Sequence, residues 1–128
     1  MSANVPTNLK YTQSHEWVKA EGDLLVIGIT DHAQHELTDV VFVELPAPGR
    51  QLAAGEACAV VESVKTASDI YSPLAGSVVA TNQQVVDNPA LVNSDPYGAG
   101  WFFKIKPVNP AELSNLLSPD QYQALIGG

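Results

Sequence analysis

The chain has 128 residues and a mass of 13.6 kDa, which predicts one domain spanning residues 1–128, with a core at about 22–106. Hydrophobic residues make up 45%, with 9 Gly and 9 Pro, so the composition is that of a folded domain with many turns. Fourteen acidic and 6 basic residues give a net charge of −8, which argues against nucleic acid as a partner, because that binding depends on Lys and Arg.

The first half of the chain predicts two strands and one helix. A strand at 24–27 follows the turn at 21–23, and a first hairpin is expected there. Residues 30–37 begin with a capping Thr30 and an acidic first turn, which predicts a short helix. The β-branched and aromatic run at 40–45 predicts a strand that ends at Pro46.

The second half predicts further strands and two closing helices. Strands are expected at 58–62, 71–72, 76–80 and 101–105, and the turn-rich segment 87–98 predicts a loop with one helical turn. Capping signals at 109–112 and 118–121 predict two helices within about 109–126. The fold class is therefore mostly β: a small flattened barrel or sandwich of antiparallel strands with short peripheral and C-terminal helices.

The sequence argues against several kinds of chemistry. Cys58 is the only cysteine, which excludes an internal disulfide and a zinc site built from several thiolates. His32 and His35 are a possible metal-binding pair, with Glu36 beside them on a predicted helix, but no further ligand follows at motif spacing, so we expect no metal. No nucleophile elbow and no phosphate-binding glycine loop is present, so neither hydrolase chemistry nor nucleotide binding is indicated.

The chain predicts no membrane association and a reducing compartment. The segment from Met1 to Lys10 has no signal-peptide core, and the apolar runs are short. One cysteine fits the cytoplasm of a bacterium, or the mitochondrial matrix for a processed eukaryotic chain. Cys58 itself is predicted to be a buried small hydrophobic residue rather than a redox partner. The aromatic residues Trp17, Trp101, Phe102 and Phe103 are predicted to belong to the core.

Lys65 is the candidate functional residue that the spacing singles out. It is one of five lysines and lies in the short segment 63–68 between two predicted strands, so it is expected at a hairpin tip. A lysine in a turn is most often merely solvated. A hairpin tip, however, presents an exposed and rigidly held amine, as an enzyme that modifies lysine requires. Glu62 and Asp69 make its neighbourhood acidic.

A wider pattern resembles a known family. It includes SHEWV at 14–18, GITDHAQ at 28–34, VFVELP at 41–46, VESVK at 61–65 and DPYG at 95–98, with shorter matches at 10–11, 68–69, 72–73, 76, 91–93, 100–101 and 104–106. These segments resemble, in order and over nearly the whole chain, the H proteins of the glycine cleavage system. The resemblance implies the barrel-sandwich hybrid fold of lipoyl domains.

The resemblance implies that Lys65 carries lipoate in amide linkage and that the chain is a non-catalytic carrier. In the family, a pyridoxal-phosphate-dependent glycine decarboxylase places the aminomethyl group of glycine on the arm. A tetrahydrofolate-dependent aminomethyltransferase then removes it, and dihydrolipoyl dehydrogenase reoxidises the arm. A lipoate–protein ligase or an octanoyltransferase attaches the cofactor. Two alternatives stay open: a relay of lipoyl or octanoyl groups in lipoate metabolism, and an unmodified interaction domain.

Biotin is the nearest rival cofactor. Biotinyl domains resemble this hairpin but flank their lysine with methionine on both sides. Here the neighbours of Lys65 are Val64 and Thr66, and the sole methionine is Met1. The resemblance therefore favours lipoate over biotin.

The resemblance also implies roles for residues around the lysine. Ser14, Glu16 and Asp69 are expected to line a groove that receives the arm, because a hydroxyl and carboxylates can hydrogen-bond a cationic amine. The alternative is that Ser14 and Glu16 are solvated on an edge strand. Lysine presentation and ligase recognition are expected to involve Glu62, Ser63, Val64 and Gly76. The pocket histidine found after Gln in some family members corresponds to Glu36, so a part for His35 or Glu36 in docking stays open.

Overall fold

The computed structural model describes residues 5–127, so Met1 lies outside the described residues. The larger antiparallel sheet has six strands, in the order β1 (Lys10–Tyr11), β2 (Glu16–Glu21), β3 (Leu24–Ile29), β9 (Phe103–Pro107), β8 (Gly76–Thr81) and β5 (Gln51–Leu52). The smaller has three, in the order β4 (Val40–Glu44), β6 (Ala57–Ser63) and β7 (Ala67–Tyr71). The helices are α1 (Asp31–Leu37), α2 (Gln83–Asp87), α3 (Ala90–Ser94), a 3₁₀ helix η1 (Pro110–Asn115) and α4 (Pro119–Leu125).

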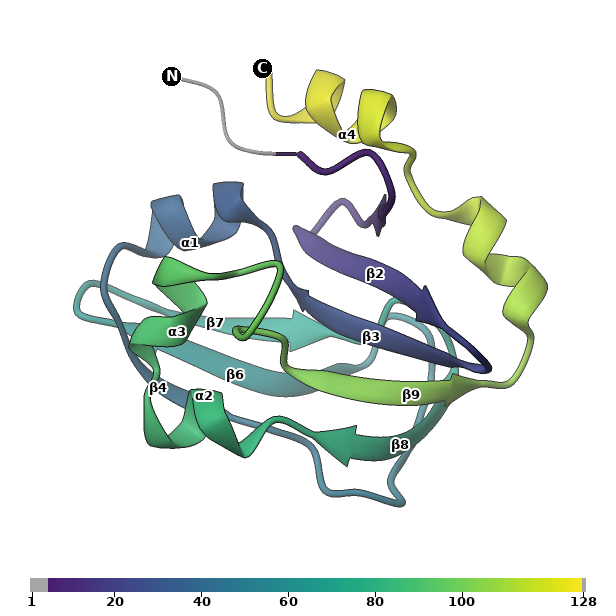
Figure 1. Ribbon diagram of the computed structural model, residues 1–128, viewed down its shortest axis with the longest axis horizontal. Coiled ribbons are helices and arrows are strands. Elements are labelled where there is room, and N and C mark those ends of the chain that lie inside the picture. Colours follow the sequence, from purple (N-terminus) through teal and green to yellow (C-terminus); the bar gives the residue numbers. More distant parts are fainter. Residues whose placement is uncertain (1–4, 128) are drawn as a thin grey trace.

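The predicted fold class is confirmed: antiparallel strands dominate, and short helices lie at the periphery (Figure 1). The strands form two separate sheets that do not close into one barrel. The main core contains side chains from both sheets. From β3 it takes Leu25, Ile27 and Ile29, because alternate residues of a strand point to the same face. From β6 and β7 it takes Val61 and Ile70.

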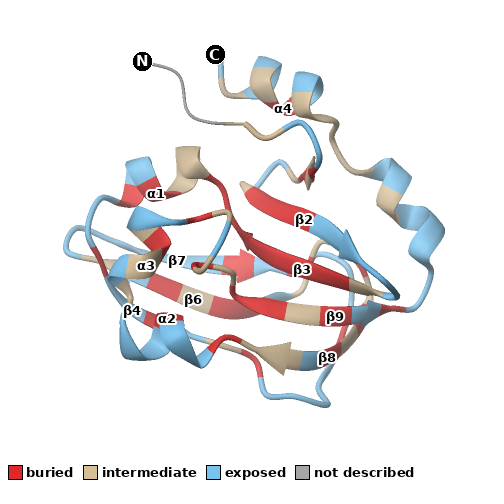
Figure 2. Cartoon of the chain, in the orientation of Figure 1, coloured by how far each residue is buried: buried red, intermediate tan, exposed pale blue. Residues whose placement is uncertain are grey.

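A second apolar cluster lies on the other face of the six-stranded sheet, under α4 (Figure 2). Tyr11 from β1 stacks on Tyr122 from α4 with ring centroids 4.6 Å apart. Trp17 is buried there and donates its Nε1–H to the carbonyl oxygen of Pro96 at 2.9 Å. Gly28 lies opposite Trp17, and a Cβ at Gly28 would lie 2.7 Å from the indole ring. The indole therefore packs directly against the backbone of β3.

The predicted helix-capping signals are confirmed. The Thr30 hydroxyl accepts a hydrogen bond from the N–H of Ala33 and caps α1. Ser118 and Gln121 form a reciprocal capping box at the start of α4. The first predicted C-terminal helix is the 3₁₀ helix η1, capped by Asn109. The sequence does not predict that this helix is 3₁₀, because capping signals do not distinguish 3₁₀ from α geometry.

Several boundaries differ from the predictions. The helical turn predicted within 87–98 is α3, which buries Val92. The helix α2, just before it, is not predicted by the sequence and buries Val85. Pairing with β6 starts β7 at Ala67 rather than at Tyr71. Trp101 lies before β9 and is only partly buried, with the Lys104 ammonium 5.1 Å from its ring centroid. The two-residue strands β1 and β5 form by pairing with distant strands and have no signature of their own.

Candidate functional site

Lys65 lies at the tip of the β6–β7 hairpin, as predicted. The Ser63 hydroxyl accepts hydrogen bonds from the backbone N–H groups of Lys65 and Thr66, each at 3.2 Å. The N–H of Ser63 donates to the carbonyl oxygen of Thr66 at 2.7 Å and closes the turn. Ser63 therefore fixes the backbone that carries Lys65.

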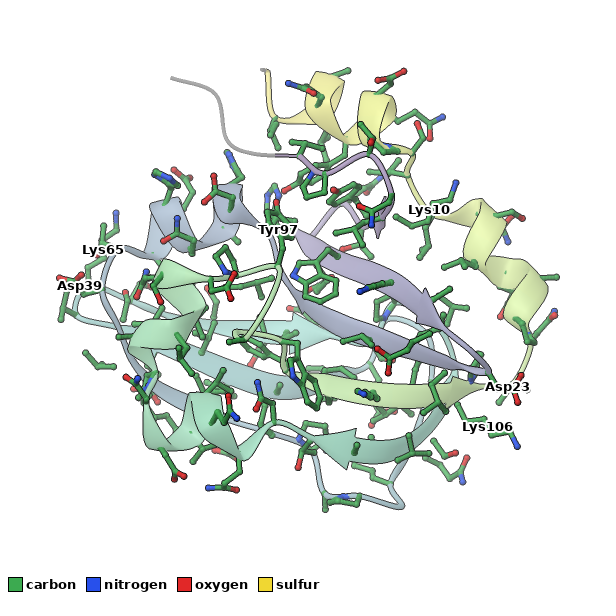
Figure 3. The ribbon with its side chains drawn as sticks, in the orientation of Figure 1. Lys10, Asp23, Asp39, Lys65, Tyr97 and Lys106 are labelled. Atoms are coloured by element: carbon green, nitrogen blue, oxygen red, sulfur yellow. The ribbon has the colours of Figure 1, made fainter. Side chains whose placement is uncertain are left out.

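A second contact anchors the tip to the neighbouring segment. The N–H of Val64 donates to the carbonyl oxygen of Asp39 at 3.0 Å, just before β4 begins. Lys65 is exposed, and within residues 5–127 its ammonium has no ion pair or hydrogen bond. Figure 3 shows Lys65 beside Asp39 at one end of the molecule, with Asp23 and Lys106 at the other. The amine is thus held on a rigid support and is open to solvent.

A groove of about 400 Å³ begins beside this tip. It runs along β7, whose other side pairs with β6, and it is bounded across from β7 by α1, the end of β3 and the loop before β2. Its apolar lining is Ile29, Ala33, Leu37, Val61 and Ile70, and its polar lining is Ser14, His15, Glu36, Thr66, Ser68, Asp69 and Tyr71. Such a lining suits a long apolar chain that ends in a polar group.

The structure brings Ser14 and Asp69 together in this groove but gives Glu16 another place. Glu16 is fully buried, so its solvated alternative is wrong. Its Oε1 accepts hydrogen bonds from the hydroxyls of Thr12 and Ser14, and its Oε2 accepts the N–H of Tyr71 at 3.2 Å. Glu16 lines a second hollow of about 310 Å³ next to the groove. It therefore ties the loop before β2 to β7.

His15 is a groove residue that the sequence reasoning missed. Its φ is +72°, in the left-handed region, and this turns its side chain toward α1 and α4. Its Nδ1 lies 2.8 Å from the hydroxyl of Tyr122, which lies 2.7 Å from the hydroxyl of Thr30. Thr30 already accepts from Ala33, so all groups are satisfied when Thr30 donates to Tyr122 and Tyr122 donates to His15. That arrangement needs a neutral His15.

Burial, with a smaller contribution from His32, lowers the pKa of His15 below its usual value, against an opposing effect of Glu36. The rings of His15 and His32 are 4.8 Å apart. A signal for His15 was present, because it lies between the two motif residues Ser14 and Glu16. No cluster of three metal-ligating side chains occurs in the described part of the chain.

His35 and Glu36, the two α1 residues considered for arm docking, lie in different surroundings in the structure. Glu36 lines the groove, whereas His35 is exposed and its Nε2 lies 3.6 Å from Oδ1 of Asp31. Gly76 is not brought to Lys65. It pairs with Pro107 at the Lys106 end of the molecule, where a Cβ would lie 2.6 Å from the carbonyl oxygen of Lys106. The structure gives Gly76 a packing role between β8 and β9.

Cys58 is buried on β6, as predicted, and its thiol donates to the carbonyl oxygen of Ile70 at 3.5 Å. Burial raises the pKa of this thiol to about 12. Because the thiolate is the reactive species, the Cys58 sulfur is a poor nucleophile at neutral pH. Its packing is that of a small hydrophobic residue.

Comparison with known proteins identifies the family. The model of the glycine cleavage H-protein family matches residues 9–127. The chain belongs to the glycine cleavage H-protein family. The glycine cleavage system H protein of Aromatoleum aromaticum is 61% identical over 125 residues, 97% of each chain. That of Neisseria gonorrhoeae is 59% identical over 123 residues, 95% of this chain and 92% of its own.

The fold agrees with a solved member of the H-protein family. The crystal structure of the H protein from Mycobacterium marinum superposes with a TM-score of 0.89 at 41% identity, covering 97% of this chain and all of that one. Members of this family are the lipoyl carriers of the glycine cleavage system, and this is the function of the chain. No helix within residues 5–127 is long and apolar enough to cross a membrane.

Proposed function

We propose that Lys65 is the residue that carries lipoate. The observation that carries this proposal is an unpaired, exposed amine on a hairpin whose turn is fixed by Ser63 and anchored to Asp39. A ligase needs such an amine because the acyl group must reach the nitrogen without unfolding the hairpin. The other four lysines lie on strands of the six-stranded sheet.

The groove beside Lys65 fits the attached group. An extended lipoyl-lysine side chain reaches roughly 13 Å from its Cα at the bond lengths of an extended chain. Asp69 is the third residue of β7, roughly 7 Å along the strand from Ala67 at about 3.3 Å per residue, so it lies within the reach of an arm that starts at the hairpin tip. The apolar lining matches the hydrocarbon part of the arm, and Ser14, Glu36 and Asp69 match a polar end.

When bound, lipoate supplies a disulfide that opens to take up the aminomethyl group of glycine. The carboxylates of Glu36 and Asp69 and the hydroxyl of Ser14 are acceptors for a cationic amine in the groove. His15, held neutral by burial and by Tyr122, adds no positive charge that would repel this amine. Glu16 acts indirectly, because it accepts the Ser14 hydroxyl and holds Tyr71.

The remaining roles follow from this assignment. We expect the chain to be non-catalytic, with the chemistry supplied by glycine decarboxylase, the aminomethyltransferase and dihydrolipoyl dehydrogenase, and with loading by a lipoate–protein ligase or an octanoyltransferase. Ser63 and Val64 present the lysine, and Glu62 takes part in ligase recognition. The cytoplasm stays a prediction, supported by the single cysteine and by the bacterial relatives.

Loading followed by mass spectrometry tests the assignment. The protein is incubated with ATP, lipoate and a lipoate–protein ligase, and the product is analysed by intact mass and peptide mapping. We expect a gain of one lipoyl group on Lys65 and none in Lys65→Arg, with unchanged circular dichroism. Lys106→Arg is the matched control and loads normally. A lipoyl group on another lysine would refute the assignment.

Hydrogen exchange tests the groove. Amides of β7 are followed in the loaded protein before and after it takes up the aminomethyl group from glycine. We expect slower exchange across 67–71 in the wild type and a smaller effect in Asp69→Asn and Glu36→Gln. Exchange across 67–71 that does not change in the wild type when the aminomethyl group is taken up would show that the arm does not lie along β7.

A further inference from the structure

The outer side of the small sheet carries exposed apolar side chains. Phe42 and Glu44 on β4 are exposed on either side of the buried Val43, and on β6 the exposed Glu62 and the half-buried Val60 flank the buried Val61. The register sets Phe42 opposite Glu62 and Glu44 opposite Val60. The exposed fraction is 45% for Phe42 and 67% for Val64. Val64 comes two residues after Glu62 and continues the alternation of Val60 and Glu62. We call Phe42, Glu44, Val60, Glu62 and Val64 the β4–β6 face.

The β4–β6 face is continuous with the support of Lys65. Val64 immediately precedes Lys65, and its N–H is bonded to Asp39 one residue before β4. A protein seated on Phe42 therefore touches the same rigid unit that presents the amine. A β-bulge between Val40 and Phe42 also leaves Val41 exposed, at 55%, beside this face. Exposed valines and a phenylalanine grouped in this way are typical of an interaction site.

The charge of the β4–β6 face points to one kind of partner. Glu44 and Glu62 lie among the apolar side chains, and within residues 5–127 neither has an ion pair. Lys65 is the only Lys or Arg in β4, β6, β7 and the β6–β7 turn. Arg50 lies outside these strands and pairs with Glu56 at 2.8 Å. A complementary surface has a small apolar centre surrounded by Lys and Arg.

The location of the face separates it from the groove. None of its five side chains lines the groove, which is bounded by α1, β7 and the loop before β2. An enzyme that docks on the β4–β6 face can reach the bare amine of Lys65 and leave the groove free for the arm. Enzymes that act later must instead bind an arm that is already attached to Lys65.

We propose that the β4–β6 face is the docking surface of the enzyme that acylates Lys65, a partner with basic side chains around an apolar patch. This proposal rests on Lys65 being the loaded residue. In the step itself, the deprotonated Nζ attacks the carbonyl carbon of an acyl adenylate or acyl thioester. An amide bond forms, the C–O or C–S bond breaks, AMP or the thiol leaves, and the proton passes to solvent.

Steady-state acylation of surface variants tests the proposal. A lipoate–protein ligase, ATP and lipoate are used with wild type, Phe42→Ser and Glu44→Lys, and the rate is read by intact mass. We expect KM to rise about tenfold for Phe42→Ser, as for the loss of an interface anchor, with kcat unchanged. Glu44→Lys is expected to raise KM several-fold and to flatten its dependence on salt.

Two controls match these variants in exposure and charge. Val79 on β8 is 42% exposed and Glu112 on η1 is exposed, and both lie away from the face. Val79→Ser and Glu112→Lys are expected to keep the wild-type KM, and thermal unfolding checks that every variant is folded.

Three results would overturn the proposal: an unchanged KM in both face variants, an equal rise in the controls, or normal loading combined with weaker binding of the loaded variants to glycine decarboxylase. Failure of the underlying assignment is seen separately, because peptide mapping of the wild type would then place the lipoyl group elsewhere.

Discussion

Replacing Glu16 by alanine removes a fully buried carboxylate with three hydrogen-bond donors around it. The hydroxyls of Thr12 and Ser14 lie 3.3 Å apart and can bond to each other after the change. The N–H of Tyr71 has no such substitute on this side of β7. The variant thus loses charge-assisted hydrogen bonds and leaves one backbone donor without its partner.

The size of the effect follows from these losses. Hydrogen bonds to a charged group contribute roughly 1.5–3 kcal/mol each, and an unsatisfied buried donor costs about 1–3 kcal/mol. Removing the carboxylate also removes the cost of burying its charge, and this offsets part of the lost hydrogen-bond energy. We expect Glu16→Ala to lower the free energy of unfolding by about 2–4 kcal/mol, a large share of the roughly 5–15 kcal/mol of a typical domain. The corresponding fall in Tm is on the order of 10 °C.

Urea unfolding followed by tryptophan fluorescence measures this loss. Glu16→Gln keeps the shape and the hydroxyl partners and is expected to fall between wild type and Glu16→Ala. Glu112→Ala, at an exposed carboxylate, is the control and is expected to stay within about 0.5 kcal/mol of wild type. A loss below about 1 kcal/mol for Glu16→Ala would refute the assigned tie between β2 and β7.

Two further predictions concern the second cluster and its neighbour His15. The pKa of His15 is lower in the folded than in the unfolded protein, so the unfolded chain binds more protons at acid pH. The contribution of neutral His15 to the free energy of unfolding is therefore fully present above about pH 6.5 and is lost as the pH falls through the folded pKa. His15→Asn, which accepts the positive φ, is expected to flatten this acid-side slope in urea titrations, and an unchanged slope would contradict the assignment. Gly28→Ala places a Cβ 2.7 Å from the indole of Trp17, which its bond to Pro96 holds in place. We expect a loss of about 1–3 kcal/mol in the urea midpoint analysis and a shifted tryptophan emission; wild-type values for both would show that the ring can move away.

The local signals in the sequence predicted the elements whose stability is local. Thr30 and Ser118 cap helices, and the alternation around Val43 and Val61 marks strands with one buried face. The hairpin tip at Lys65 is also local, because short strands on both sides leave few ways to connect them. The family resemblance added the role of this lysine, which spacing alone left open.

Only the tertiary structure decided how distant segments meet. From the sequence alone, Glu16 could be a solvated surface carboxylate. In the structure it is buried and accepts the N–H of Tyr71 on β7, which is 55 residues away in the chain. His15 becomes a groove residue because α1 and α4 close around it. The groove and the β4–β6 face are separate because β7, and not β4, is the edge strand of the small sheet that lies across from α1. Sequence patterns record whether a residue prefers burial, whereas its partners are fixed by packing between elements that the chain brings together only on folding.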